Sequence, residues 1–88
     1  MVVDDDEGIC EFIGSLLEMT GNVKVARFSS ADSALSDFTA NPGQYQFILT
    51  DFEMPGMNGG EFCQRVLALA PTAKLPQALQ AVQFTNAF

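Results

Sequence analysis

The chain has 88 residues, 48% of them hydrophobic, and a formal net charge of -7. This length supports one small domain with a single core. The four basic residues are scattered, which argues against direct nucleic-acid binding because such binding requires clustered Lys and Arg. No apolar run approaches the roughly 20 residues that span a bilayer, and no signal peptide is recognisable, so we expect a cytoplasmic protein without a membrane partner.

The first half of the chain alternates short apolar runs with amphipathic segments. Residues 1–3 read as a strand, and residues 7–20 as a helix because their apolar residues follow a 3, 4, 7, 8 spacing. These apolar residues are Ile9, Phe12, Ile13, Leu16 and Leu17. A second strand is predicted over residues 23–28. A second helix is predicted over residues 31–40, after Ser29 and Ser30 as capping residues.

The second half continues this alternation. Residues 45–50 form the third predicted strand, whose run Phe47-Ile48-Leu49 suits a strand covered on both faces. Residues 60–70 form the third predicted helix. Local propensity after Pro76 favours another helix in the last segment, with a fourth strand over residues 81–85 as the alternative. Strands alternating with single helices predict an α/β domain with right-handed crossovers and a parallel sheet.

Acidic residues follow two strands of this predicted sheet. Asp4-Asp5-Asp6-Glu7 follows the first strand, and Asp51 follows the third. Ligands of open α/β sheets collect just outside the carboxyl ends of the strands, so these carboxylates should converge there. Converging carboxylates repel one another unless a cation lies between them, and Mg²⁺ suits a site with few oxygen ligands. Asp6 and Glu7 are better explained as first-turn residues that complement the helix dipole.

The acidic motifs resemble those of a known family. Val2-Val3-Asp4-Asp5-Asp6, followed later by Asp51-Phe52-Glu53-Met54-Pro55-Gly56-Met57-Asn58-Gly59, closely resembles the receiver domain of two-component response regulators. The resemblance covers about residues 1–75 and leaves the tail, residues 76–88, unassigned. It implies a flavodoxin-like, doubly wound sheet with strand order 2-1-3-4-5, and residues 1–88 would be a single, truncated receiver domain.

The resemblance also implies roles for individual residues. Asp51 matches the phosphoacceptor, which would take a phosphoryl group from a sensor histidine kinase or a phosphotransfer protein. Asp5 matches the residue that binds Mg²⁺ directly, Asp4 the one that reaches it through water, and Glu53 the one that offers its main-chain carbonyl. The chain would then be a signalling domain rather than an enzyme, with at most self-catalysed phosphoryl transfer.

The chain departs from the family pattern in its last part. It contains no Lys after Lys74, so a phosphoryl-binding Lys is not found, and Thr85 is the only candidate for the switch hydroxyl. The chain therefore looks like a receiver domain cut short at its C-terminus and trimmed at its N-terminus. In that case the third strand would be an unpaired edge, which predicts a homodimer with residues 75–88 crossing to the partner. The alternative function is a non-catalytic module for dimerisation or protein interaction.

Overall fold

The computed structural model describes residues 1–21, 23–41, 43–69 and 81–84. Their strands form one parallel sheet in the order β2-β1-β3-β4. The strands are β1 (Val2–Val3), β2 (Arg27–Phe28), β3 (Phe47–Thr50) and β4 (Ala81–Phe84), and the helices are α1 (Glu7–Gly21), α2 (Ala31–Ala40) and α3 (Gly59–Leu69). This is the flavodoxin-like α/β architecture, and the order agrees with the first four strands of the predicted 2-1-3-4-5.

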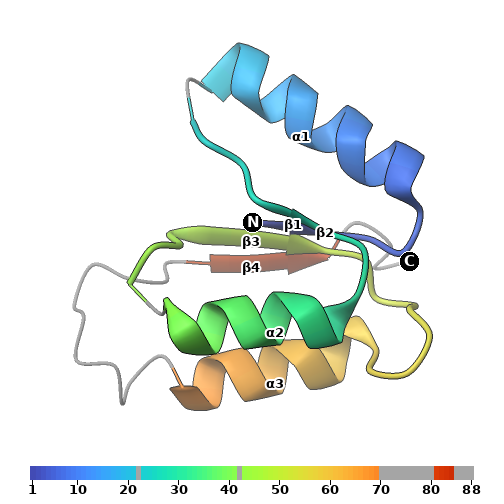
Figure 1. The fold of residues 1–88 in the computed structure, drawn as a ribbon, viewed down its shortest axis with the longest axis vertical. Helices are drawn as coiled ribbons and strands as arrows, with labels where there is room; N and C mark the ends of the chain where they lie inside the picture. Colours follow the sequence, from blue (N-terminus) through green and yellow to red (C-terminus); the bar gives the residue numbers. More distant parts are fainter. Residues whose placement is uncertain (22, 42, 70–80, 85–88) are drawn as a thin grey trace.

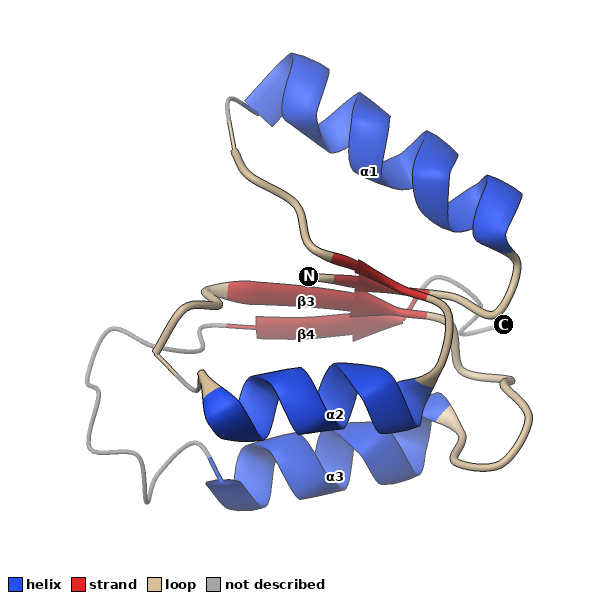
Figure 2. Ribbon diagram, viewed as in Figure 1, coloured by secondary structure: helices blue, strands red, loops and turns tan. Residues whose placement is uncertain are grey.

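The helices are divided unequally between the two faces of the sheet (Figure 1). α2 and α3 lie side by side on one face, which we call the two-helix face, and α1 alone lies on the other, the one-helix face. Figure 2 shows that α1 is inclined to the strands and diverges from the sheet toward its C-terminal end. The three strand–helix–strand units therefore enclose one well-covered face and one that is covered only in part.

The hydrophobic core lies between the sheet and the two helices of the two-helix face. Side chains of successive strand residues point to opposite faces, so alternate residues of each strand enter this core. Ile48 is buried there, with Val82 packed against the same cluster. The fully buried members from the helices are Ala34, Phe38, Phe62 and Val66.

Each helix begins at a capping residue just beyond the carboxyl end of a strand. The side-chain oxygens of Asp6, Ser30 and Asn58 accept hydrogen bonds from the backbone N–H groups three residues later, at 3.1, 3.2 and 2.8 Å. Such caps satisfy N–H groups that have no partner within the helix. The expected capping role of Ser30 is confirmed, and Asp6, expected in the first turn, is the capping residue just before α1. All three helix N-termini lie at the same edge of the sheet, as in Figure 1.

The sequence favoured a helix in the last segment. That prediction is wrong for the residues of the segment that the structure describes. Residues 81–84 form β4, and residues 76–80 lie outside the described part of the chain. β4 pairs in parallel with all four residues of β3, from Phe47 opposite Ala81 to Thr50 opposite Phe84. A strand edge has unsatisfied N–H and C=O groups, and pairing them outweighs the weak helical propensity of a short segment.

β4 also corrects two expectations about β3. The third strand is not an unpaired edge, because β1 and β4 flank it, and β4 is provided by the same chain. Nor is it covered on both faces, since Phe47 is 57% exposed on the one-helix face. The stated reason for a homodimer is therefore wrong, and the dimer itself stays a prediction.

Most of the remaining element bounds differ only slightly from those predicted, but the second strand, expected over residues 23–28, is much shorter. β2 is limited to Arg27–Phe28 because β1 offers only Val2 and Val3 as pairing residues. β3 begins at Phe47 rather than at residue 45, and α3 begins at Gly59 rather than at residue 60. Within the described residues, no helix is both long and apolar enough to cross a membrane.

Candidate functional site at the carboxyl edge of the sheet

Asp4 and Asp51 are held by the central strands of the sheet. Asp4 follows β1, and its N–H donates to the carbonyl of Phe28 at 3.1 Å. Asp51 follows β3, and its N–H donates to the carbonyl of Val3 at 2.9 Å. Both backbones thus continue the sheet hydrogen bonds by one residue, which places the two side chains at the same carboxyl edge on rigid supports.

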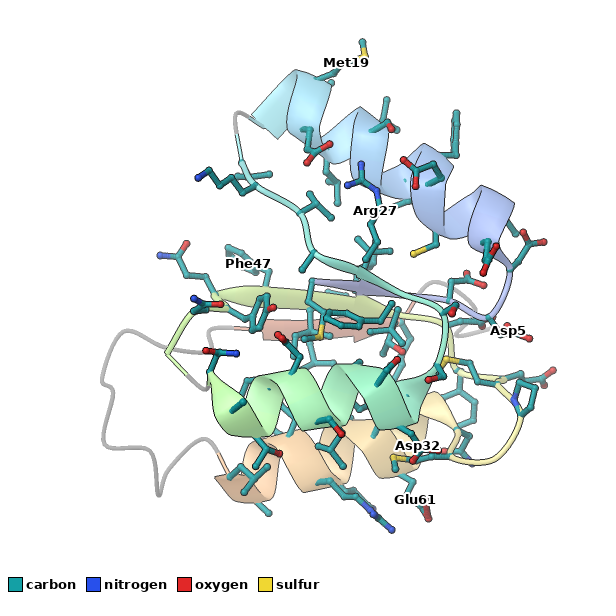
Figure 3. The ribbon with its side chains drawn as sticks, viewed as in Figure 1. Asp5, Met19, Arg27, Asp32, Phe47 and Glu61 are labelled. Carbon is teal, nitrogen blue, oxygen red and sulfur yellow. The ribbon has the colours of Figure 1, made fainter. Side chains whose placement is uncertain are left out.

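Asp5 completes a cluster with these two residues. Carboxylate oxygens of Asp4, Asp5 and Asp51 all lie within 4.8 Å of one another. Asp4 and Asp51 are buried, at 4% and 6% exposure, whereas Asp5 is exposed at the edge of the sheet, as Figure 3 shows. The structure therefore brings together the three acidic side chains that topology predicted to converge, with one of them facing solvent.

Burial and charge act together on Asp4. Burial raises the pKa of the Asp4 carboxyl, and the neighbouring charges of Asp51, Asp5 and Asp6 raise it further. One hydrogen bond opposes these effects, because the N–H of Asp6 donates to Oδ1 of Asp4 at 2.9 Å. A bound cation would relieve the repulsion among these partly buried negative charges.

The loop after β3 holds the Asp51 side chain from the other side. The N–H of Glu53 donates to Oδ1 of Asp51 at 3.3 Å, while the Glu53 side chain is exposed. Gly59 closes the loop, since its N–H donates to the carbonyl of Phe52 at 2.7 Å. A Cβ at Gly59 would lie 2.3 Å from the carbonyl oxygen of Asp51, so only glycine permits this approach.

The loop also contains a left-handed turn. Gly56 has φ +79°, a region that non-glycine residues rarely adopt, and no atom lies within 4 Å of a Cβ built there. Between Gly56 and the helix, Met57 is buried in the core and Asn58 caps α3. The turn therefore connects the acidic edge directly to the two-helix face.

One contact at this edge has no signal in the sequence pattern. The rings of Phe52 and Phe84 meet edge to face with centroids 5.5 Å apart, which links the residue after Asp51 to the end of β4. Phe84 belonged to the unassigned tail, so only the three-dimensional pairing of β3 and β4 could reveal this neighbour. Thr85, the candidate hydroxyl, lies outside the described residues.

Comparison with known proteins places this geometry in a family. The model of the response regulator receiver domain matches residues 1–81. The chain belongs to the response regulator receiver family. The match extends beyond residue 75, where the sequence resemblance ended, and reaches the first residue of β4.

A curated relative of this receiver domain points in the same direction. The chain is 31% identical over 91 residues to the C4-dicarboxylate transport transcriptional regulatory protein DctD of Rhizobium meliloti (strain 1021). The alignment covers 93% of this chain and 19% of the relative, so the chain spans about a fifth of that protein's length. No solved structure matches this chain.

Proposed function

We propose that this receiver domain accepts a phosphoryl group on Asp51 from a phosphohistidine of a sensor histidine kinase or phosphotransfer protein, in the presence of Mg²⁺. One observation carries the proposal: carboxylate oxygens of Asp4, Asp5 and Asp51 lie within 4.8 Å of one another at the carboxyl edge of the sheet. Membership of the receiver family supports a role in two-component signalling. We propose the cytoplasm as the place of this reaction.

The donor set fits a hard divalent cation. Three carboxylates offer only oxygen ligands, and Mg²⁺ typically binds through one or two carboxylates while it keeps several waters. Asp5 and Asp51 would bind it directly, Asp4 through water, and Glu53 through its main-chain carbonyl. The raised pKa of Asp4 supports this assignment, because a cation would favour the charged form that burial disfavours.

In the proposed reaction, the Asp51 carboxylate is the nucleophile. One of its oxygens forms the new P–O bond while the P–N bond to the imidazole breaks, and the electron pair returns to the ring nitrogen. The metal ion, when bound, neutralises charge on the transferred phosphoryl group. The N–H of Glu53 donates to Oδ1 of Asp51 and so fixes the orientation of the attacking group.

Two features of the last part of the chain affect the proposed rate. We propose Thr85, which follows the last residue of β4, as the hydroxyl that contacts the phosphoryl group. The 88 residues contain no Lys after Lys74. Removing one preorganised donor typically costs about 10²- to 10³-fold in rate, so we expect slow labelling of this chain.

Backbone NMR of the Mg²⁺ titration tests the metal site. We expect millimolar affinity, with shifts at the amides of Asp5, Asp51 and Phe52, and loss of these shifts in Asp5→Asn. Asp32→Asn is the matched control, because Asp32 is an exposed carboxylate in the first turn of α2 outside the cluster. Unchanged spectra at tens of millimolar Mg²⁺ in the folded wild type would contradict the site.

Mass spectrometry after incubation with a small phosphodonor tests the acceptor. An added phosphoryl mass should map to Asp51 and vanish in Asp51→Asn, while Asp32→Asn is labelled like the wild type. The alternative, an interaction module without phosphoryl chemistry, predicts no labelling of the wild type at any Mg²⁺ concentration. Labelling that persists in Asp51→Asn would assign the acceptor to another residue.

A further inference from the structure

One asparagine of this chain is followed by glycine, at the point where the loop after β3 enters α3. The Asn residues of the chain are Asn22, Asn41, Asn58 and Asn86, and Asn58–Gly59 is the only Asn-Gly pair. The backbone nitrogen of the residue after an Asn can attack the side-chain amide carbon. Glycine favours this attack, because it has no Cβ in the way and its backbone is flexible. Since Asn58 is exposed to water, its amide is the one most open to deamidation.

Deamidation of Asn58 would proceed through a cyclic imide. The nitrogen of Gly59 loses its proton and bonds to Cγ of Asn58, while the bond from Cγ to Nδ2 breaks and the side-chain nitrogen leaves as ammonia. Water then adds to either imide carbonyl and breaks the bond of that carbon to the Gly59 nitrogen. Opening at Cγ gives aspartate, and opening at the main-chain carbonyl gives isoaspartate. The reaction therefore needs no reagent other than water.

The fold engages both reacting groups in other hydrogen bonds. The N–H of Gly59 donates to the carbonyl of Phe52 at 2.7 Å, which opposes the loss of its proton. Oδ1 of Asn58 accepts from the N–H of Glu61 at 2.8 Å, which fixes this side chain as the cap of α3. Gly59 is also buried, unlike Asn58. Attack therefore requires that the loop opens and that these hydrogen bonds break, and such local opening does not need global unfolding.

An aromatic contact with β4 supports the closed loop. Phe52 provides the carbonyl that binds Gly59, and its ring meets the ring of Phe84 edge to face with centroids 5.5 Å apart. The same ring lies close to Gly60, where a Cβ would be 3.1 Å from Cε2 of Phe52. Phe52 thus contacts both the end of β4 and the first turn of α3. Loss of the Phe84 ring should therefore weaken the closed loop.

The close packing of Gly59 determines what the modification would do. Aspartate at position 58 can still cap α3, and its charge suits a helix N-terminus. Isoaspartate directs the main chain through the side chain and adds a carbon between residues 58 and 59. A Cβ at Gly59 would already lie 2.3 Å from the carbonyl oxygen of Asp51. The loop therefore cannot accommodate the longer main chain unless it moves away from Asp51.

We propose that Asn58 is a deamidation site whose reactivity is controlled by opening of the loop between Asp51 and α3, and that bound Mg²⁺ lowers this reactivity. The first part depends only on the hydrogen bonds of Asn58 and Gly59. The second part rests on the proposed function, in which Asp51 and the carbonyl of Glu53 bind the metal ion. A cation that binds only the closed loop stabilises that state.

Peptide mapping by mass spectrometry at mildly alkaline pH tests control by the fold. Conversion of Asn58 to aspartate and isoaspartate should be more than about tenfold slower in the folded chain than in guanidinium chloride. Asn41 is the internal control, because Pro42 has no N–H and the imide cannot form there in either state. Equal rates for Asn58 in the two states, or no conversion in guanidinium chloride, would overturn the proposal.

Two substitutions of Phe by Ala test control by the loop. Phe84→Ala should accelerate conversion of Asn58 in native buffer by about 2- to 10-fold, the factor that loss of an aromatic contact corresponds to. Phe47→Ala is the matched control, since Phe47 begins β3 at the end remote from Asp51. Phe84→Leu, which keeps an apolar side chain, should have a smaller effect. Equal rates in the Phe84→Ala and Phe47→Ala variants, both folded by circular dichroism, would contradict control by this loop.

Added Mg²⁺ tests the second part of the proposal. Millimolar Mg²⁺ should slow conversion of Asn58 in the wild type and have no effect in Asp5→Asn. If the amide shifts show that Mg²⁺ binds and conversion is not slowed, the coupling between metal and loop is refuted while the metal site stands. If there are neither shifts nor slowing, the metal site and this coupling both fail. The comparison of folded and unfolded chains still decides the first part.

Discussion

The two faces of the sheet use the same types of residue with opposite results. On the two-helix face, Phe38 and Phe62 are 0% exposed between the helices and the sheet. On the one-helix face, Phe12 and Phe47 are 68% and 57% exposed. For Phe47 the difference comes from coverage, since two adjacent helices shield one face and a single inclined helix leaves the other partly open. Phe12 is exposed because it lies on the side of α1 opposite to the buried Cys10 and Gly14. An apolar pattern therefore indicates which side of a helix avoids water, but not whether a partner is present.

The largest expected effect is the loss of a core ring on the two-helix face. Phe38→Ala should reduce the free energy of unfolding by about 3–5 kcal/mol, because it removes apolar contacts and leaves a cavity. A domain of this size has little stability to spare, so the variant should be largely unfolded in moderate urea. Urea titration followed by circular dichroism measures the change.

Phe12→Ala on α1 is the matched comparison for Phe38→Ala. In the monomer its effect should stay within about 0.5 kcal/mol, as for most exposed positions. Equal losses of unfolding free energy at low concentration would refute the contrast between the faces.

A pair of glycines should show the same contrast on a smaller scale. At Gly59 a new Cβ would meet the backbone oxygen of Asp51 at 2.3 Å, whereas at Gly14 it would meet the guanidinium of Arg27 at 2.4 Å. The backbone of Asp51 cannot move away unless the whole loop moves. Gly59→Ala should therefore reduce the free energy of unfolding by about 1–3 kcal/mol and weaken Mg²⁺ binding. The Arg27 side chain can rotate away, so the improved helix propensity of Gly14→Ala, about 1 kcal/mol, should offset its cost.

Thermal melting with and without Mg²⁺ distinguishes the two glycine variants. Gly59→Ala should lower the melting temperature and reduce the gain on adding Mg²⁺. Gly14→Ala should change neither by more than a small amount. A Gly14→Ala variant as unstable as Gly59→Ala would show that α1 is held as rigidly as the loop at the acidic edge.

Sequence reasoning recovered the features that local chemistry controls. The helix starts were predictable because Asp6 and Ser30 cap their own helices, and the acidic cluster followed from the parallel topology. Sequence reasoning failed where contacts between residues far apart in the sequence determine the structure. β4 forms because β3 offers a strand edge, and the contact of Phe52 with Phe84 depends on that pairing. The same limit explains α1, whose buried positions are Cys10 and Gly14 rather than the larger apolar residues Phe12 and Leu16.

Neutralising Asp4 should stabilise the metal-free domain. The raised pKa of Asp4 means that the folded state binds its proton more tightly than the unfolded state. The loss of stability caused by ionised Asp4 is therefore absent below the ordinary pKa of 3.8. The loss grows as pH rises to the raised pKa, and it is complete above that pKa. Asp4→Asn, which can still accept from the N–H of Asp6, should raise the melting temperature at neutral pH.

The gain from Asp4→Asn should shrink as pH falls toward 3.8, and it should also shrink on adding Mg²⁺ to the wild type. Melting curves across this pH range, with and without Mg²⁺, check both dependences. Asp32→Asn, which is outside the cluster, should show neither. A gain that does not change with pH would assign the effect to packing rather than to charge.

Glu18 on the one-helix face should give the smallest effect, with the opposite dependence on pH. Its hydrogen bond and ion pair with Arg27 lower the pKa of Glu18, so its stabilisation is present above the ordinary pKa of 4.5 and is lost as pH falls through the lowered value. Glu18→Gln should therefore lower the melting temperature slightly at neutral pH and not at all in acid. Because this carboxylate is exposed, added salt should also reduce the difference. A destabilisation that persists unchanged in acid and in high salt would show that Glu18 holds α1 by packing, and Arg27 would then not be the ionic support of that helix.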